Sequence, residues 1–350
     1  MARSGNKTYN YNATVRDQFA RHENQSGEIG IEIECEGTHL PAAKDISEYW
    51  TIHADGSLRG ESAEYVMTKP VNRKNVWPAL EYLEKLFAEC KTKLKESYRT
   101  SVHVHVNMQK IPIRQIFNVI LMYGIVEDIL TEYAGVTRVG NLFCLRMSDA
   151  EFMLQELRQA AERDSYQALN SNGLRYAGCN IKSLFDHNSL EFRAFRGTSD
   201  MKLISEWIDI ILNIKDSALT YQNPSEMLQN FSNLGPEGFI NKNFSPTLRR
   251  VIESAPQWRD KITTGVRLVQ DVAYANDWAP TPEKSSTEKR ELKMAYYELN
   301  NIDLAQLLNA VPDEVLAAGR ARIRAPVGGL GIRPQPAPQD AWPAREEEEL

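Results

Sequence analysis

Ionisable side chains stand two residues apart in three short segments of this chain, with an apolar residue between them. The three pairs are Glu32 with Glu34, His103 with His105, and Glu191 with Arg193. Side chains two apart in a β-strand project from the same face, and the residue between them projects from the other. Each segment therefore predicts a strand with one apolar face toward a core and one charged face. A site shared by the three strands explains this pattern better than three separate accidents.

A fourth segment places carboxylates after a turn. Asp55-Gly56 is a turn signal between strands, and Glu61 and Glu64 follow it. A turn of this kind needs no further purpose, so this segment is the weakest signal of the four. Its position before a strand that carries a glutamate keeps Asp55 and Glu64 among the candidate site residues.

These side chains predict a metal site. Magnesium and manganese prefer oxygen ligands, and manganese or a mixed site also accepts histidine. By itself the His103/His105 strand fits a zinc site, a hard-metal site or a pair of hydrogen-bonded core histidines about equally. The glutamates on the neighbouring segments, and the lack of a third histidine strand, favour magnesium or manganese. The candidate ligands are Glu32, Glu34, Glu64, His103, His105 and Glu191.

Arginines near these segments are candidates for binding a phosphate. Arg193 could neutralise a phosphate oxygen while Glu191 binds metal, or the two could form an ordinary ion pair on one strand. Arg175, Arg196 and Arg138 are further candidate nucleotide contacts, without a decisive argument for any of them. No GxxxxGK[ST] loop or GxGxxG fingerprint follows a strand, so a bound nucleotide would be held through metals and arginines on a sheet.

The elements that must position these residues follow from hydrophobic periodicity. Strands are expected at residues 29–36, 49–54, 62–67, 100–107 and 189–194, and helices at 75–95, 113–133, 149–164 and 202–219. Shorter helical segments are expected at 248–254, 261–274 and 288–308. The predicted organisation is a flexible or loosely docked N-terminal arm (1–26), a catalytic domain (27–222), a helical C-terminal subdomain (223–310) and a disordered tail (311–350).

Composition limits the classes of partner. The chain has 350 residues, a net charge of -6 and a pI near 5.7, which argues against a nucleic-acid partner held by broad electrostatics. Its four cysteines form no CxxC pair and are expected to be free thiols. No apolar run suggests a signal peptide or a membrane span, so a cytoplasmic protein without a membrane partner is expected.

An ordered set of five motifs resembles the putative amidoligase family. The motifs are GIEIECEG at residues 30–37, DGSL at 55–58 before a strand glutamate, SVHVHVN at 101–107, RYAGCNI at 175–181 and SLEFRAFRGTSD at 189–200. The resemblance covers about residues 28 to 220. The family belongs to the carboxylate-amine ligases related to glutamine synthetase and glutamate-cysteine ligase, and many members are phage or prokaryotic proteins. A cytoplasmic location would be that of the host cell if the protein is phage-encoded.

The resemblance implies a fold and an activity. The fold would be α+β, with a curved, mainly antiparallel sheet forming an active-site funnel and helices packed on its other face. The activity would be ATP-dependent formation of an amide or isopeptide bond through an acyl-phosphate, with two Mg2+ or Mn2+ ions. The substrates would be a carboxylate and an amine, either of which could be a small molecule, a peptide or a protein. The oligomeric state is left open.

The resemblance also assigns roles to residues. One metal would take Glu32, a histidine (His103 or His105) and Glu191, and the other would take Glu34 and Glu64, with Glu61 a weaker match than Glu64. Arg193 would contact phosphate, and Asp55 would orient or deprotonate the amine. Two alternatives stay open: a phosphotransferase on a related scaffold, and a non-catalytic assembly protein with a degenerate ligase fold.

Overall fold

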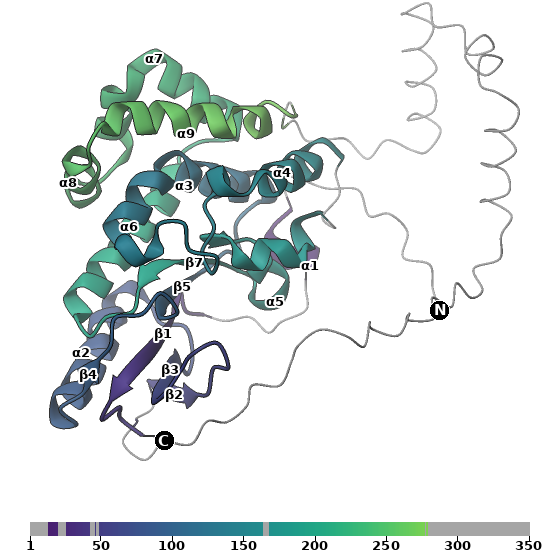
Figure 1. The fold of residues 1–350 in the computed structure, drawn as a ribbon. Helices are drawn as coiled ribbons and strands as arrows, with labels where there is room; N and C mark the ends of the chain where they lie inside the picture. The colour runs from purple at the N-terminus through teal and green to yellow at the C-terminus, as the bar shows by residue number, and fades with distance from the viewer. Residues whose placement is uncertain are drawn as a thin grey trace, which may run out of the picture. The chain divides into compact units, whose positions relative to one another are not determined.

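Seven strands form one sheet in the order β2-β3-β1-β5-β7-β6, with β4 also paired to β1 (Figure 1). The computed structural model describes residues 13–19, 26–42, 46, 49–163, 168–276 and 278. The strands are β1 Ile29–Thr38, β2 Trp50–His53, β3 Ser62–Met67, β4 Lys93–Leu94, β5 Ser101–Asn107, β6 Cys179–Asn180 and β7 Ser189–Arg196. Every named pair of strands is antiparallel. The predicted α+β class with a mainly antiparallel sheet is therefore confirmed.

The apolar face of the sheet packs against helices. The helices are α1 Val15–Phe19, α2 Val76–Glu89, α3 Ile113–Ala134, α4 Glu151–Arg163, α5 Ser183–His187, α6 Met201–Ala218, α7 Pro224–Asn243, α8 Pro246–Ser254 and α9 Trp258–Ala273. Phe195 of β7 stacks on Trp207 of α6, with ring centroids 5.0 Å apart, and Phe192 meets Tyr123 of α3 edge to face at 5.1 Å. The alternation in the strands thus leaves the charged residues on the opposite face.

Strand β7 departs from strict alternation at one point. Val104 of β5 pairs with Phe192, but Val102 pairs with Phe195, so two residues along β5 oppose three along β7. This is the geometry of a β-bulge. The extra residue lets both phenylalanines enter the core, while Glu191 lines the cavity on the polar face.

Helix α3 is the centre of the helical layer. It is buried along most of its length, as the sequence predicted, and it carries polar residues inside the core, among them Asn118 and Glu127. Helix α9 crosses it at Gly265, where an added Cβ would lie 2.3 Å from the carbonyl oxygen of Ile125. The two helices therefore contact each other backbone to backbone. The described residues fall within one compact unit, and the predicted boundary near residue 222 stays a prediction.

Helix α2 ends at Glu89, so it is shorter than the helix predicted at residues 75–95. The prediction was wrong for the residues after Glu89. Lys91 takes a left-handed conformation, with φ of 55°, and the N–H groups of Lys91 and Thr92 donate to the carbonyls of Ala88 and Phe87. This is a Schellman ending, which usually has glycine where Lys91 stands. After it the chain forms β4, which pairs with the end of β1.

Helix α7 was not predicted, because Gly235 and Pro236 interrupt it. Gly235 has φ of 66° and marks a kink inside the helix. Asn223 caps its start by accepting a hydrogen bond from the N–H of Glu226. Glycine and proline side by side normally indicate a loop, so the sequence pattern hid this helix.

The N-terminal segment is docked where it is described. In residues 13–19 the Val15 side chain is fully buried, and the N–H groups of Val15 and Arg16 donate to the carbonyls of Ile111 and Gln109. These residues are therefore docked, and the description of the whole N-terminal arm stays a prediction. The helix predicted at 288–308 and the tail at 311–350 lie outside the described residues. Within the described chain, no helix combines the length and apolarity that a membrane span requires.

Candidate active site

Strand register brings the predicted charged pairs together on the polar face of the sheet. Three cross-strand pairs result: Glu34 with Glu64, Glu32 with His103, and His105 with Glu191. Paired residues on neighbouring antiparallel strands project from the same face, about 5 Å apart at their Cβ atoms. Four strands, β3, β1, β5 and β7, thus contribute to one continuous polar surface.

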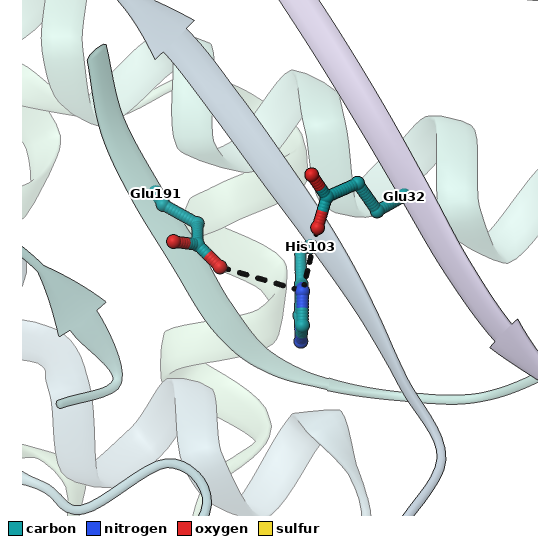
Figure 2. Close-up of side chains that lie close together, drawn as sticks. All are labelled: Glu32, His103 and Glu191. Atoms are coloured by element: carbon teal, nitrogen blue, oxygen red, sulfur yellow. Dashed lines mark hydrogen bonds and ion pairs between the residues drawn. The ribbon is translucent and has the colours of Figure 1, made fainter. Parts of the chain in front are cut away.

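The first candidate metal group consists of Glu32, His103 and Glu191. Figure 2 shows the His103 ring between the two carboxylates, with Nδ1 3.1 Å from Glu32 Oε2 and 3.3 Å from Glu191 Oε1. An octahedral ion with bonds of about 2.1 Å places neighbouring ligand atoms about 3 Å apart. Both distances from the histidine are therefore those that a shared ion needs, and the ligand atoms of all three side chains lie within 4.8 Å of one another.

The second candidate metal group consists of Glu34, Asp55 and Glu64. One oxygen from each carboxylate lies within 4.8 Å of the others. Asp55 reaches this group from the loop before β3, and its Oδ1 accepts a hydrogen bond of 2.6 Å from the N–H of Ser57. Asp55 was predicted to orient or deprotonate an amine, but the structure places it beside two carboxylates as a further possible ligand.

Not every glutamate of the predicted segment joins these groups. Glu61 is exposed, and its carboxylate accepts a hydrogen bond of 3.3 Å from the N–H of Leu40. Glu61 belongs to neither of the two candidate metal groups that the described residues form. Of the two glutamates after the turn, Glu64 therefore belongs to the site.

Two residues that the sequence did not indicate hold the carboxylates in place. Ser101 donates to Glu34 and lies 2.8 Å from Nε2 of His103, so it links the two groups. Asn180 of β6 donates to Glu191 Oε2 at 2.5 Å. Only the strand register shows that these neutral side chains face the carboxylates.

Several carboxylates share this small volume. Burial, together with the carboxylates of Glu32, Glu34 and Asp55, raises the pKa of Glu64 to about 7. Burial also raises the pKa of Glu34, although His103 and Ser101 act in the opposite direction. A raised carboxyl pKa means that nearby positive charge does not compensate for the burial and the like charges.

The other group is closer to charge balance. Burial raises the pKa of Glu32, but hydrogen bonds from His103 and His105 outweigh it and hold the pKa well below its usual range. Burial acts on Glu191 in the same way, and the charges of Arg193 and the two histidines lower its pKa overall. Hard oxygen ligands with a single histidine, and uncompensated negative charge nearby, fit magnesium or manganese.

A cavity of about 360 Å³ lies over the first group. Glu32, Glu64 and Glu191 line it together with the basic side chains of Arg175, Lys182 and Arg193. Arg193 donates to Glu191 Oε1 at 2.5 Å. Arg175 is exposed and makes no hydrogen bond or ion pair with another described residue, so its guanidinium remains available to an anion.

The other two predicted nucleotide contacts are engaged elsewhere. Arg138 is 1% exposed, and its guanidinium donates to the carbonyl oxygens of Tyr98, Thr100, Arg193 and Ala194. Arg196 donates to the carbonyls of Tyr133 and Ala134 at the end of α3. Neither lines the cavity, and both tie loops to the sheet. These partners favour a structural role for both arginines, and their contact with a nucleotide stays a prediction.

A buried carboxyl group lies beneath the site, on α3. Glu127 Oε2 accepts a hydrogen bond of 2.7 Å from the N–H of Met147, and Oε1 has no hydrogen-bond partner among the described residues. Burial raises the pKa of Glu127 to about 8. An added Cβ at Gly178, directly before β6, would lie 2.8 Å from Oε1. Glu127 was not among the predicted site residues, because a glutamate beside Asp128 in a helix usually faces solvent.

The fold and the site define an α+β protein with clustered carboxylates and histidines on the polar face of an antiparallel sheet. Residues 47–215 match the family described as "Putative amidoligase enzyme", which confirms the resemblance drawn from the motifs. The match includes Asp55, Glu64, the histidine pair and Glu191, and it begins after β1. It supports a ligase at a coarse level. No curated protein matches the chain.

Proposed function

We propose that this protein is an ATP-dependent carboxylate-amine ligase that forms an amide or isopeptide bond through an acyl-phosphate. One observation carries the proposal: residues of both candidate metal groups, Glu32, Glu64 and Glu191, line a cavity that is also lined by three basic side chains. Carboxylates suit divalent cations, and arginine or lysine suits phosphate oxygens. The polar sheet face would then form the wall of the active-site funnel that the family resemblance implies.

The residues divide the work between binding and charge neutralisation. Glu32, His103 and Glu191 would hold one divalent ion, and Glu34, Asp55 and Glu64 the other. Such ions neutralise the β- and γ-phosphate oxygens of ATP. Arg193 and Arg175 would contact the remaining phosphate oxygens from the same cavity. The position of Asp55 between two glutamates favours a ligand role over the proton-acceptor role predicted from the sequence.

The net reaction balances in atoms and charge. A carboxylate oxygen bonds to the γ-phosphorus while the bond to ADP breaks, which gives an acyl-phosphate. An amine nitrogen then bonds to the acyl carbon while the bond to phosphate breaks. Two protons leave the ammonium form of the amine, one before the attack and one after it. The products are the amide, ADP and inorganic phosphate.

The direct test is turnover with candidate substrates. Purified protein with Mg-ATP and mixed pools of carboxylates and amines is expected to release ADP and phosphate only when both pools are present. Glu32→Ala and Glu191→Ala are expected to stop the release, because each removes a ligand of the first ion. Glu61→Ala is the matched control, since this glutamate follows the same turn but lies outside both groups.

Three results would contradict the proposal. ATP turnover without a divalent metal would remove the role of the carboxylates. A phosphorylated product of the mass of one substrate plus phosphate, with no amide, would indicate a phosphotransferase. No turnover with any acceptor, together with normal metal binding, would favour the non-catalytic assembly role.

A further inference from the structure

A second cavity, of about 190 Å³, adjoins the candidate metal site. Glu32, His105 and His187 line both cavities. The rings of His105 and His187 meet edge to face, with centroids 5.6 Å apart. The two cavities therefore meet at a common wall that contains a ligand of the first metal group.

The linings of the two cavities differ in charge. The larger cavity is lined by three basic side chains and four carboxylates, whereas no lysine or arginine lines the smaller one. The smaller cavity has two carboxylates, Glu28 and Glu32. Glu28 is neutralised by Arg73 and Lys215, which bind it at 2.9 and 2.5 Å. Glu32 pairs with His103 and His105 at 3.1 and 3.2 Å. The basic side chains of the larger cavity therefore suit a phosphate, and the smaller cavity, with Glu32 and without lysine or arginine, suits an amine.

The size and walls of the smaller cavity limit the amine. Val66 and Pro70 form an aliphatic wall, and no phenylalanine, tyrosine or tryptophan lines the cavity. An apolar cavity of about 150 Å³ holds a benzene molecule, so this one has room for about six to eight non-hydrogen atoms. A nucleoside is much larger than this. A short aliphatic chain fits.

The floor of this cavity is Gly30, in the middle of β1 and opposite His105. Its φ is not in the left-handed region, and an added Cβ would make only an ordinary contact of 3.5 Å with His105 Cβ. Neither backbone conformation nor packing therefore requires glycine at this position. Glycine inside a strand weakens it, and often marks a place where a ligand approaches closely.

We propose that the cavity over Gly30 binds the acceptor of the ligase reaction, and that this acceptor is a primary amine at the end of a short aliphatic chain. The proposal rests on the function proposed above. A chain lying along Val66 and Pro70 would place its nitrogen at Glu32, where the two cavities meet. A free alkylamine and the side chain of a lysine share this chemistry.

Calorimetric titration of the full chain with n-alkylamines tests the cavity without catalysis. From propylamine to pentylamine, affinity is expected to rise about fourfold for each methylene, since each CH2 leaves water for the aliphatic wall. Pentanoate is expected to bind at least tenfold more weakly than pentylamine. Equal binding of pentanoate, or displacement of pentylamine by adenosine, would overturn the proposal. Nα-acetyl-lysine amide tests whether a lysine side chain competes with pentylamine.

Substitution of the floor gives a second test. Gly30→Leu would fill the cavity from its floor and is expected to weaken pentylamine binding at least tenfold, while Gly30→Ala has a smaller effect. Mn2+ titration of the same variants verifies that the neighbouring site is intact. Val66→Ala enlarges the cavity and is expected to move the preference to amines longer than pentylamine. Unchanged pentylamine affinity in Gly30→Leu, or an unchanged preference in Val66→Ala, would refute the assignment.

Hydroxylamine separates this inference from the proposed function. It is too small to need the cavity, and it captures an acyl-phosphate as a hydroxamate. With Mg-ATP and a carboxylate pool, hydroxamate formation by a protein that does not bind pentylamine would overturn the cavity assignment alone. Pentylamine binding that Gly30→Leu abolishes, without hydroxamate or ADP from any carboxylate, would overturn the ligase reaction and leave the amine cavity.

Discussion

Replacing Glu127 by glutamine is expected to change how the stability of the protein depends on pH. The pKa of this carboxyl is raised by burial from 4.5 to about 8 in the folded chain. Between these values the unfolded chain has released the proton while the folded chain still holds it. The folded state then binds more protons, so the free energy of unfolding falls as pH rises, by about 1.36 kcal/mol for each pH unit. Over the whole interval the loss is roughly 5 kcal/mol.

Glu127→Gln removes this loss, because an amide does not ionise. Its oxygen can still accept the hydrogen bond from the N–H of Met147. At pH 5 the variant and the parent protein are expected to differ by about 1 kcal/mol or less, the scale of one hydrogen bond. At pH 9 the variant is expected to be several kcal/mol more stable than the parent.

Urea unfolding at pH 5, 7 and 9 measures the difference between the two proteins, and other titrating groups cancel in it. Glu132→Gln is the matched control on the same helix, since Glu132 forms an exposed ion pair with Lys261. Its effect is expected to stay near or below about 1 kcal/mol at all three pH values. A constant difference between Glu127→Gln and the parent from pH 5 to pH 9 would refute the reasoning, because it would show that the buried carboxyl does not titrate in this range.

Further predictions concern the metal groups and the packing. Glu191→Gln and Glu34→Gln are each expected to reduce Mn2+ binding from two equivalents to one in calorimetric titrations, since each residue belongs to a different group. Binding of two equivalents by both variants would contradict the two-ion assignment. Arg138→Met is expected to lower the free energy of unfolding by about 3 kcal/mol in urea, because it leaves buried carbonyls without a donor, and a change below about 1 kcal/mol would show that those carbonyls have other partners. Gly265→Ala is expected to lower the free energy of unfolding by about 3 kcal/mol, because the added Cβ pushes α9 away from Ile125. A thermal unfolding temperature equal to that of the parent would show that the two helices can move apart without loss of stability.

Regular alternation made most of the strands predictable. The strand predicted at residues 62–67 has the bounds of β3, and those at 29–36 and 100–107 differ from β1 and β5 by one or two residues. The order of strands was not readable, because it depends on contacts between distant segments. Without that order, Ser101 and Asn180 could not be recognised as partners of the site carboxylates.

The failures on helices have local causes. After α2 ends, Lys91 takes a conformation that glycine usually adopts. Because the residue is a lysine, the sequence contained no glycine to indicate the end of the helix. In α7 the pair Gly235-Pro236 indicated a loop, although the chain resumes its helix after a kink.

Arg138 was predicted to contact a nucleotide because of its charge alone. Its role depends on four carbonyl groups that a sequence pattern does not contain.

The bulge in β7 decides which face Phe195 occupies. Phe192 and Phe195 stand three residues apart, yet both face the helices because the bulge takes up one residue. Deleting Ala194 would leave the two phenylalanines two residues apart, so a regular ladder with β5 would keep both on the same face. This deletion should therefore preserve the stacking of Phe195 on Trp207, whereas a regular ladder that kept Ala194 would turn Phe195 toward the cavity.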